Sequence, residues 1–228
     1  CAVRGVESQS ETIWRQADRY AVPRIAFVNK MDRPGADFLR VVGELRDRLG
    51  AEPVPLQLPL GTAEDFRGVI DLVGQRALTW DDQTLGTRVD VGPVPPAFAD
   101  LVREHRDRLL AAAAEGDEAL LARYLETGDL AEADLRRGLR RRSLRGEVVP
   151  VLCGSAFRNR GVQALLDAVI DYLPSPADRP PVRGALPGGA IADCAARDDE
   201  PFAALAFKIV NDTYHGRLTF IRVYSGVL

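Results

Sequence analysis

Three polar residues, Asn29, Lys30 and Asp32, directly follow the run R-I-A-F-V at residues 24–28, which is typical of a buried strand. Open α/β folds bind ligands beyond the carboxyl ends of their strands, so we expect these side chains at the rim of a sheet. The Asp32 carboxylate can accept hydrogen bonds from the ring N–H and the exocyclic amino group of guanine, and adenine lacks this pair of donors. Asn29 can bridge the base to neighbouring loops, and the Lys30 stem can lie over the purine face. The N-K-x-D pattern therefore predicts a guanine site.

The lysine at position 30 favours this interpretation over the alternative, an ordinary polar turn after a strand. The chain has 30 basic residues, and its only lysines are Lys30 and Lys208. The slim lysine stem and the wide arginine fork are not interchangeable, so a lysine in an arginine-rich chain indicates a specific requirement. We expect Lys208, which lies in an A-F-K-I-V strand pattern, to be structural or to lie on a barrel surface.

A second element that could contact a base is Gly154-Ser155-Ala156, which follows a predicted buried strand at 148–153 and precedes a helix. Small residues there leave backbone N–H groups open to an acceptor such as the guanine carbonyl oxygen. The alternative is a plain strand-to-helix turn. Ser155 lies 126 residues beyond Asn29, which is too far for one crossover connection. We therefore expect residues 51–147 to be a self-contained insertion, so that the two strands are neighbours and their ends meet at one rim.

The remaining pattern predicts alternating helices and strands. A capping box, Ser8-Gln9-Ser10-Glu11, marks a first helix with apolar positions at 13, 17 and 20, and a second amphipathic helix covers 38–49. Between 51 and 147 we expect an extended segment at 54–60, strands at 69–73, 77–80 and 88–91, and helices near 98–114, 118–126 and 132–142. After the strand at 148–153 we expect a helix with an apolar stripe at 162, 165, 166, 169, 170 and 173, then irregular chain at 174–200 and two strands between 202 and 224 that open a β-barrel.

Composition excludes several classes of protein. Hydrophobic content of 46% and a net charge of −3 are those of an ordinary soluble globular protein. They are not those of a strongly basic protein that wraps around nucleic acid. The sequence has no apolar run long enough to span a membrane and no secretory signal, so we expect a cytoplasmic protein. Cys1, Cys153 and Cys194 indicate reduced thiols, and His105 and His215 have no ligand-like neighbours for a metal site.

The basic run at 136–145 contains six arginines. We expect it to be a solvated helix face, and contact with RNA or another acidic partner is the alternative.

Four blocks of sequence resemble bacterial elongation factor G, the family of GTPases that drives translocation on the ribosome. They are N-K-M-D-R-P-G-A-D-F at 29–38, P-L-Q-L-P-L-G at 55–61, C-G-S-A-F-R-N-R-G-V-Q-A-L-L-D-A-V-I-D-Y-L-P-S-P at 153–176, and D-E-P-F-A-A-L-A-F-K-I-V at 199–210. The resemblance implies an α/β fold: the latter part of a P-loop-GTPase-type doubly wound sheet at 1–50 and 148–175, with an α+β insertion subdomain at 51–147. It further implies a linker at 176–183 and the start of an antiparallel β-barrel second domain at 184–228.

The same resemblance implies roles for the residues identified above. Asn29, Lys30 and Asp32 match the guanine-specificity motif of the family, and Ser155 with Ala156 matches its second guanine loop. The implied ligand is GTP or GDP, with Mg²⁺ bound only in the intact protein. The implied partners are the ribosome directly, and transfer and messenger RNA indirectly, for a protein that is a monomer.

The sequence departs from the family in respects that matter for chemistry, because the magnesium-binding Asp-x-x-Gly segment and the first switch are absent, as is the phosphate-binding loop. The Gly-rich phosphate loop ending in Gly-Lys-Ser/Thr does not occur, because Lys30 follows Asn29 and Lys208 lies in a strand pattern. Since the chain begins with Cys1 and stops in a strand pattern, we expect a piece of a longer protein. Phosphoryl transfer depends on positioning the phosphates, so we expect no GTP hydrolysis by this piece and name no catalytic residue.

Other interpretations of the sequence stay open. One is a related ribosomal GTPase of the tetracycline-resistance protection or release-factor-recycling type. The other is a non-enzymatic module that binds the ribosome.

Overall fold

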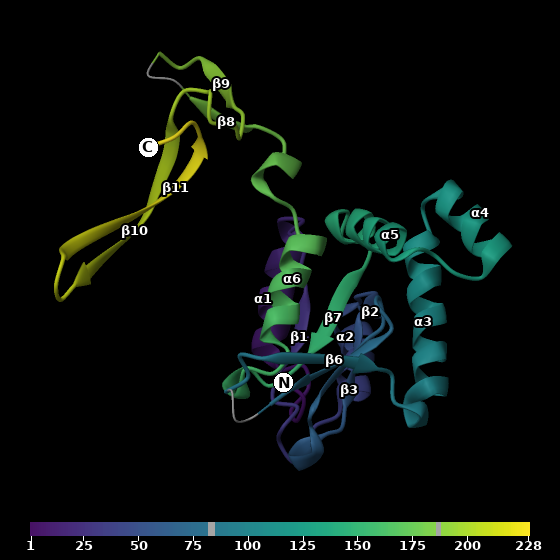
Figure 1. Cartoon of the computed structure of the whole chain (residues 1–228). Coiled ribbons are helices and arrows are strands. Elements are labelled where there is room, and N and C mark those ends of the chain that lie inside the picture. The colour runs from purple at the N-terminus through teal and green to yellow at the C-terminus, as the bar shows by residue number, and fades with distance from the viewer. Residues whose placement is uncertain (82–84, 186–187) are drawn as a thin grey trace. The chain divides into compact units, whose positions relative to one another are not determined.

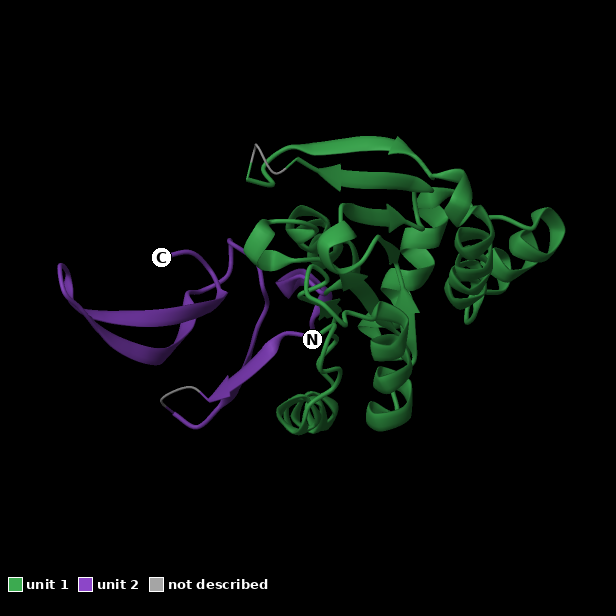
Figure 2. Ribbon diagram, turned by 90° about the horizontal axis from the view of Figure 1, so that it is seen from below, with its two compact units in different colours: residues 1–173 green, residues 174–228 purple. Residues whose placement is uncertain are grey.

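The computed structural model describes residues 1–81, 85–185 and 188–228. The chain forms two compact units, residues 1–173 and 174–228 (Figure 2). Helices and strands of both units are labelled in Figure 1.

Unit 1 is built from a parallel sheet, an antiparallel sheet and six α-helices among its described residues. In chain order these are α1 (Ser8–Arg19), β1 (Ala26–Val28), α2 (Phe38–Leu49), β2 (Pro53–Pro55), β3 (Gln57–Leu60), β4 (Gly68–Asp71), β5 (Arg76–Trp80), β6 (Val89–Pro93), α3 (Ala99–Ala114), α4 (Glu118–Thr127), α5 (Glu132–Leu144), β7 (Val149–Cys153) and α6 (Val162–Tyr172). Short 3₁₀ turns occupy Ala63–Asp65, Pro96–Phe98 and Ala156–Arg158.

The parallel sheet brings together strands that are far apart in sequence. Its order is β1-β7-β2, with Val28 paired to Cys153 and Pro55 paired to Val151. The strand β7 is buried throughout, as expected for the central strand of a parallel sheet. The predicted neighbourhood of the two site-bearing strands is therefore confirmed.

Residues 51–147 are tied more closely to the parallel sheet than the sequence predicts. The strand β2 belongs to that sheet, and the chain passes directly into β3, the first strand of the antiparallel sheet β3-β4-β5-β6. Leu56, between the two strands, donates its N–H to Val151 and accepts from the N–H of Leu72, so it joins both sheets. Side chains from both sheets and from α3 and α5 lie in one apolar core. Residues 51–147 thus lie in one compact unit with the parallel sheet, and their status as an insertion subdomain stays a prediction.

The helix α2 follows the pattern expected from its sequence. Its buried face is formed by Phe38, Val41, Val42 and Leu45. The Asp37 side chain caps the first turn by accepting from the N–H of Arg40 at 3.0 Å. Gly50 ends the helix in the left-handed conformation, with φ of 62°.

The helices α1 and α6 differ from prediction. Glu7 is the N-cap of α1 and makes no side-chain capping bond, so the predicted capping box is wrong. Ile13 and Tyr20 are exposed, and the partly buried Trp14 packs on the core instead. In α6 the buried residues are Ala168 and Tyr172, whereas Leu166, Val169 and Ile170 of the predicted stripe are exposed. Apolar side chains extend around much of α6, so periodicity alone does not select its buried face.

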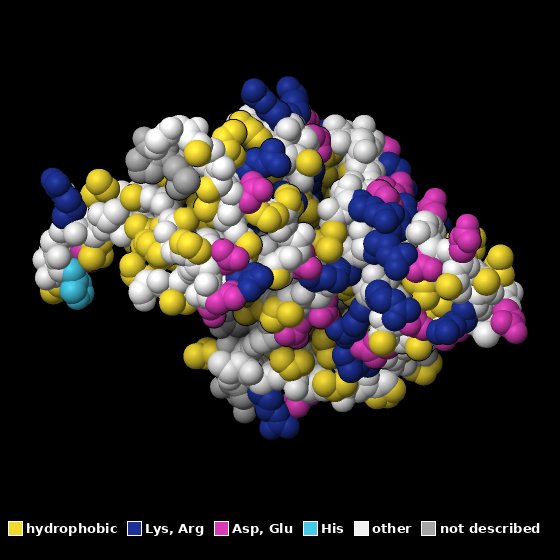
Figure 3. All heavy atoms as spheres, turned by 90° about the horizontal axis from the view of Figure 1, so that it is seen from above, with side chains coloured by type: hydrophobic (Ala, Val, Ile, Leu, Met, Phe, Trp, Pro, Cys, Tyr) yellow, Lys and Arg dark blue, Asp and Glu magenta, His cyan; other side chains and the backbone are white. Residues whose placement is uncertain are grey.

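The arginines of α5 are engaged within the chain. Arg140 donates to three carbonyl oxygens at the end of α6, each at 3.0 Å, which satisfies acceptors that the helix leaves unpaired. Arg142 is buried and binds Glu115 and Glu147. In Figure 3, basic and acidic side chains alternate over the side of unit 1 where α3, α4 and α5 lie. The run is therefore an ion-paired packing surface, and not the simple solvated face that we expected.

Unit 2 contains two antiparallel strand pairs among its described residues. These are β8 (Val182–Ala185) with β9 (Ile191–Cys194), and β10 (Ala203–Asp212) with β11 (Gly216–Ser225). A 3₁₀ turn at Pro176–Asp178 precedes them. Lys208 is exposed on β10. The two predicted strands and the turn between them are present, but Leu205, Phe207 and Ile209 are all exposed, so burial does not alternate along β10. The barrel that these strands would open stays a prediction.

Cys1, Cys153 and Cys194 are free thiols, and burial raises the pKa of the Cys153 thiol far above its usual value. None of the helices in the described part of the chain has the length and apolar character needed to cross a membrane.

Arg106 provides a test of how α3 is held on the antiparallel sheet. Its buried guanidinium donates to the carbonyls of Leu72 at 2.6 Å and Val73 at 2.9 Å. Arg106→Met keeps the apolar stem but leaves both carbonyls without this donor, so we expect a loss of roughly 1–3 kcal/mol in the free energy of unfolding. The measurement is urea unfolding followed by tryptophan fluorescence, because both tryptophans, at 14 and 80, lie in unit 1.

The matched control is Arg103→Met, one turn earlier on α3, where an exposed arginine pairs with Asp100. An exposed ion pair contributes little, so we expect a change within about 0.5 kcal/mol. Equal losses for the two variants would contradict the role assigned to Arg106.

Candidate guanine-binding site

The two predicted loops meet where β1 and β7 end. Beyond the last strand pair, the Gly154 N–H donates to the Val28 carbonyl at 3.1 Å, and the Met31 N–H donates to the Gly154 carbonyl at 3.1 Å. Backbone hydrogen bonding between the two segments therefore continues past the strands. It holds residues 29–32, which we call the first loop, against residues 154–160, which we call the second loop.

Asn29 joins the two loops through its side chain. Its Oδ1 accepts from the N–H of Lys30 at 2.7 Å and from the N–H of Ala156 at 3.0 Å. Lys30 is exposed and has a left-handed backbone, with φ of 70°. That conformation is uncommon for a residue with a side chain, and it is held by the turn that Asn29 closes. The backbone conformation of the loop thus sets the direction in which the exposed Lys30 side chain leaves the chain, and packing against a core does not.

Asp32 lies beside the second loop. Its side chain is only 10% exposed, and its Oδ2 lies 3.4 Å from Nε of Arg158. The structure thus brings together residues from both predicted elements, Asp32 and Asn29 on one side and residues 156 and 158 on the other.

Ser155 and Ala156 differ from prediction in one respect. The N–H of Ser155 donates to the Arg160 carbonyl at 2.9 Å, and the N–H of Ala156 donates to Asn29. Both groups therefore have acceptors within the chain, so the predicted pair of open amides is wrong for this structure. Ser155 is buried and serves the loop itself, whereas Ala156 is exposed and would bind a base carbonyl by exchanging its present acceptor.

Gly154 is required by close packing at the base of the second loop. A Cβ at this position would lie 2.4 Å from the Arg160 carbonyl oxygen and 2.7 Å from the Phe27 ring. A side chain cannot fit while the strand and the loop keep their present places.

The segments that connect the strands of the antiparallel sheet bind the second loop and the start of α6, through residues that the sequence analysis did not identify. Asn159 Nδ2 donates to the Leu85 carbonyl at 3.0 Å, and Gln163 Nε2 donates to the Gly86 carbonyl at 2.9 Å. Buried Arg160 donates to the carbonyl of Phe66. These donors are polar residues in the block 153–176, but nothing in their spacing indicates their acceptors.

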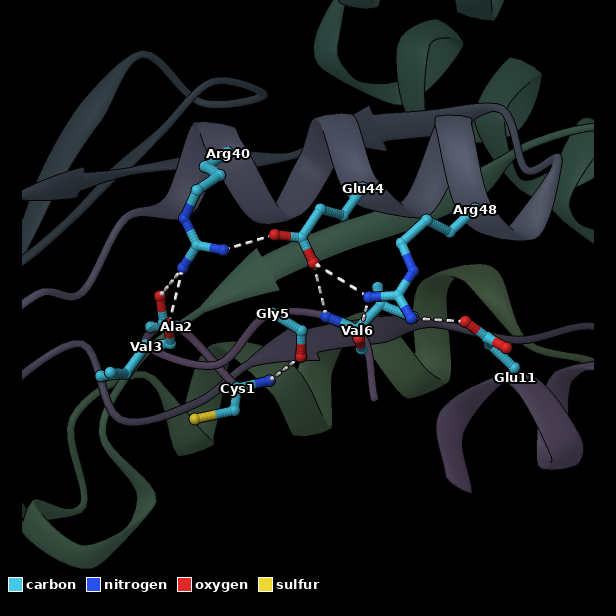
Figure 4. Close-up of polar contacts among 9 residues, drawn as sticks. All are labelled: Cys1, Ala2, Val3, Gly5, Val6, Glu11, Arg40, Glu44 and Arg48. Carbon is cyan, nitrogen blue, oxygen red and sulfur yellow. Dashed lines mark hydrogen bonds and ion pairs between the residues drawn. The ribbon is translucent and has the colours of Figure 1, made fainter. Parts of the chain in front are cut away.

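The first loop is supported by the segment that precedes α1. The Ala2 N–H donates to the Asn29 carbonyl at 2.8 Å, and the Ala2 carbonyl accepts from the Asp37 N–H at 3.0 Å. Arg40 donates to the carbonyls of Ala2 and Val3 at 3.0 and 2.8 Å (Figure 4).

Glu44 extends this support along α2. Figure 4 shows its carboxylate between Arg40 and Arg48, with Oε2 accepting from the Val6 N–H at 2.7 Å. The bond from Val6, together with Arg40, holds the pKa of the Glu44 carboxyl below its ordinary value. A lowered pKa means that the contact stabilises the segment at neutral pH and is lost as the pH falls through that pKa.

The residues present fit the base of a guanine nucleotide better than its phosphates. The site offers a carboxylate, an amide, a lysine stem and a backbone N–H, which together match the donors, the carbonyl and the flat face of guanine. Within the described residues, no three His, Cys, Asp or Glu side chains gather closely enough to hold a metal ion.

Gly154→Ala tests whether the close packing at Gly154 positions the second loop. The added methyl forces the loop away from Phe27, and overpacking of this kind costs about 1–3 kcal/mol in the free energy of unfolding. We expect urea unfolding to show this loss. Gly92→Ala is the control, because a Cβ there meets nothing within 4 Å. A Gly154→Ala protein as stable as Gly92→Ala would show that the loop relaxes without cost.

Comparisons with known proteins identify the family and support the fold. The chain is similar to the crystal structure of ttk003000868 from Thermus thermophilus, with 30% sequence identity and a TM-score of 0.78. The match covers 99% of this chain and 31% of that protein, so the chain spans about a third of the length of this relative. The family model described as the elongation factor Tu GTP binding domain matches residues 1–175, a range that includes both loops of the site. The chain therefore belongs to the translational GTPase family that carries this GTP-binding domain.

Proposed function

We propose that this chain supplies the guanine-recognising part of a GTP-binding translation factor. The observation that carries the proposal is the bond from the Ala156 N–H to Asn29 Oδ1, at 3.0 Å. It joins two loops at the ends of paired parallel strands, which is where open α/β folds bind their ligands. Membership of the GTP-binding family supports the same conclusion.

Each residue has a distinct proposed role in recognising the base. Asp32 accepts from the ring N–H and the amino group of guanine, and its low exposure protects these bonds from water. Lys30 lies over the purine face, and the Ala156 N–H donates to the guanine carbonyl oxygen. Asn29 holds the two loops at the required spacing before the base binds, when its Oδ1 is the acceptor that the Ala156 N–H then exchanges for the guanine oxygen. Ser155 secures the second loop.

For the whole protein we propose the function of elongation factor G, namely translocation of transfer and messenger RNA on the ribosome, coupled to GTP hydrolysis. The four sequence blocks that resemble this factor support the proposal. The phosphate-binding loop and the Mg²⁺ ligands would belong to parts of that protein outside residues 1–228. In this proposal the present chain contributes selectivity for the base and no catalytic group.

Asp32→Asn tests the central role. Loss of a charge-assisted pair of hydrogen bonds should weaken guanine preference by roughly 1–3 kcal/mol. Xanthine carries an oxygen where guanine carries its amino group, and the amide that this substitution introduces can donate to that oxygen. We therefore expect preference to move toward xanthosine nucleotides. The measurement is competition of GDP, xanthosine diphosphate and ADP against a fluorescent GDP.

Asp47→Asn is the matched control, because Asp47 is an exposed carboxylate on α2. It should leave all three affinities unchanged. An unaltered ratio of guanine to xanthine binding in Asp32→Asn would remove Asp32 from the site. If the unaltered chain does not prefer GDP to ADP, the non-enzymatic binding module becomes the better interpretation.

The two lysines form a second matched pair. Lys30→Met removes the ammonium and keeps an unbranched stem over the base, so we expect weaker GDP binding, by about 1 kcal/mol for a partly exposed cation over an aromatic face. Lys208→Met changes an exposed residue of unit 2 and should leave GDP affinity intact. Isothermal titration of both variants decides the point, and equal effects would contradict a specific role for Lys30.

A further inference from the structure

Arg158 places a guanidinium against the carboxylate that we propose for base recognition. Its Nε lies 3.4 Å from Oδ2 of Asp32. Arg158 belongs to the second loop and Asp32 to the first, so this ion pair crosses the site, as the bond between Asn29 and Ala156 does. The roles assigned so far to the two loops do not account for it.

A guanidinium and the edge of a guanine base have similar donor chemistry. Each presents neighbouring N–H groups in one plane, and each is matched by the two oxygens of a carboxylate. The ring N–H and amino group of guanine together need both oxygens of Asp32. A cation at Oδ2 therefore occupies part of the acceptor set that the base requires, and Arg158 competes with guanine.

The burial of the two partners shows which of them can move. The Arg158 side chain is 50% exposed, whereas that of Asp32 is 10% exposed. A half-exposed arginine can exchange its carboxylate for water at little cost, because such ion pairs contribute little. A mostly buried carboxylate has no such freedom and would be left poorly solvated without a partner. Arg158 is thus the mobile partner, and Asp32 is the fixed one.

Resting on the function proposed above, we propose that Arg158 competes with the base for Asp32: it pairs with this carboxylate when no base is bound and is displaced by guanine. Guanine offers the same pair of donors and can replace the guanidinium. Adenine has an acceptor at its ring nitrogen in place of the N–H, so it has no equivalent donor pair and leaves the ion pair in place. The arginine therefore lowers the affinity for guanine by the strength of the pair that must be broken, and it leaves the weak binding of adenine unchanged.

The experiment compares Arg158→Gln, Arg158→Lys and Arg33→Gln with the unaltered chain. GDP and ADP affinities are measured by competition against a fluorescent GDP, and urea midpoints check that each variant is folded. We expect Arg158→Gln to bind GDP about two- to fivefold more tightly, the range that corresponds to an exposed ion pair, and to bind ADP as before. Arg158→Lys keeps the charge without the fork, so its GDP affinity should lie between those of Arg158→Gln and the unaltered chain.

Arg33→Gln controls for charge alone, because Arg33 is an exposed neighbour of Asp32 in sequence. Removing a positive charge near an anionic nucleotide would by itself weaken binding. Tighter binding by Arg158→Gln, with no gain for Arg33→Gln, therefore separates competition from a general electrostatic effect.

Nuclear magnetic resonance gives a direct readout of displacement. The Nε–H signal of Arg158 is assigned by its absence in Arg158→Gln. We expect Asp32→Asn to shift this signal without nucleotide, and GDP but not ADP to shift it in the unaltered chain.

Equal or weaker GDP binding by Arg158→Gln, while Asp32→Asn still loses guanine preference, would overturn the proposal and leave the proposed function standing. A chain with no preference for GDP over ADP would reject the proposed function, and this proposal with it.

Discussion

The parallel pairing of β1 with β7 is the constraint on which the candidate site depends. Pairing of Val28 with Cys153 sets the two loops side by side, and the bonds through Gly154 extend that register beyond the strands. A slip of one residue would turn every side chain of a strand to the other face of the sheet. Asn29 could then no longer reach Ala156. The site is therefore a consequence of strand register, and the packing that buries β7 maintains it.

Several parts of unit 1 support the two loops of the site. The segment around Ala2, held by Arg40 and Glu44 of α2, supports the first loop. Connecting segments of the antiparallel sheet supply the Phe66 carbonyl to Arg160 of the second loop and the Gly86 carbonyl to Gln163 of α6. Binding residues carried on loops keep their geometry only when rigid neighbours fix those loops. The first loop is also bonded to the chain between β3 and β4, because the Ala63 N–H donates to the Met31 carbonyl at 2.8 Å. A displacement of the antiparallel sheet would therefore reach both loops of the site.

Sequence patterns predicted the elements well and some of their contacts poorly. The positions 38, 41, 42 and 45 lie on one face of α2, and all are buried, because only one face of that helix is apolar. In α6 apolar residues extend beyond one face, so the pattern could not show that Ile170 is 75% exposed. The meeting of Asp32 with residue 158, and the use of the Ser155 N–H inside its own loop, depend on backbone geometry that no spacing encodes. The sequence pattern likewise gives no sign of long-range hydrogen bonds such as the one from Arg160 to the Phe66 carbonyl.

The preference of this chain for arginine bears on both its fold and its site. Arg140 and Arg106 each bind more than one backbone carbonyl, because the guanidinium carries several donors in a fixed plane. In the proposed site the same plane lets Arg158 take up part of the acceptor set of Asp32, through Nε at 3.4 Å from Oδ2. The role proposed for position 30 reverses the requirement, because a slim lysine stem can lie over a purine face whereas a guanidinium so near Asp32 would compete for the same carboxylate. In this proposal the choice between the two cations follows from the geometry of a single carboxylate.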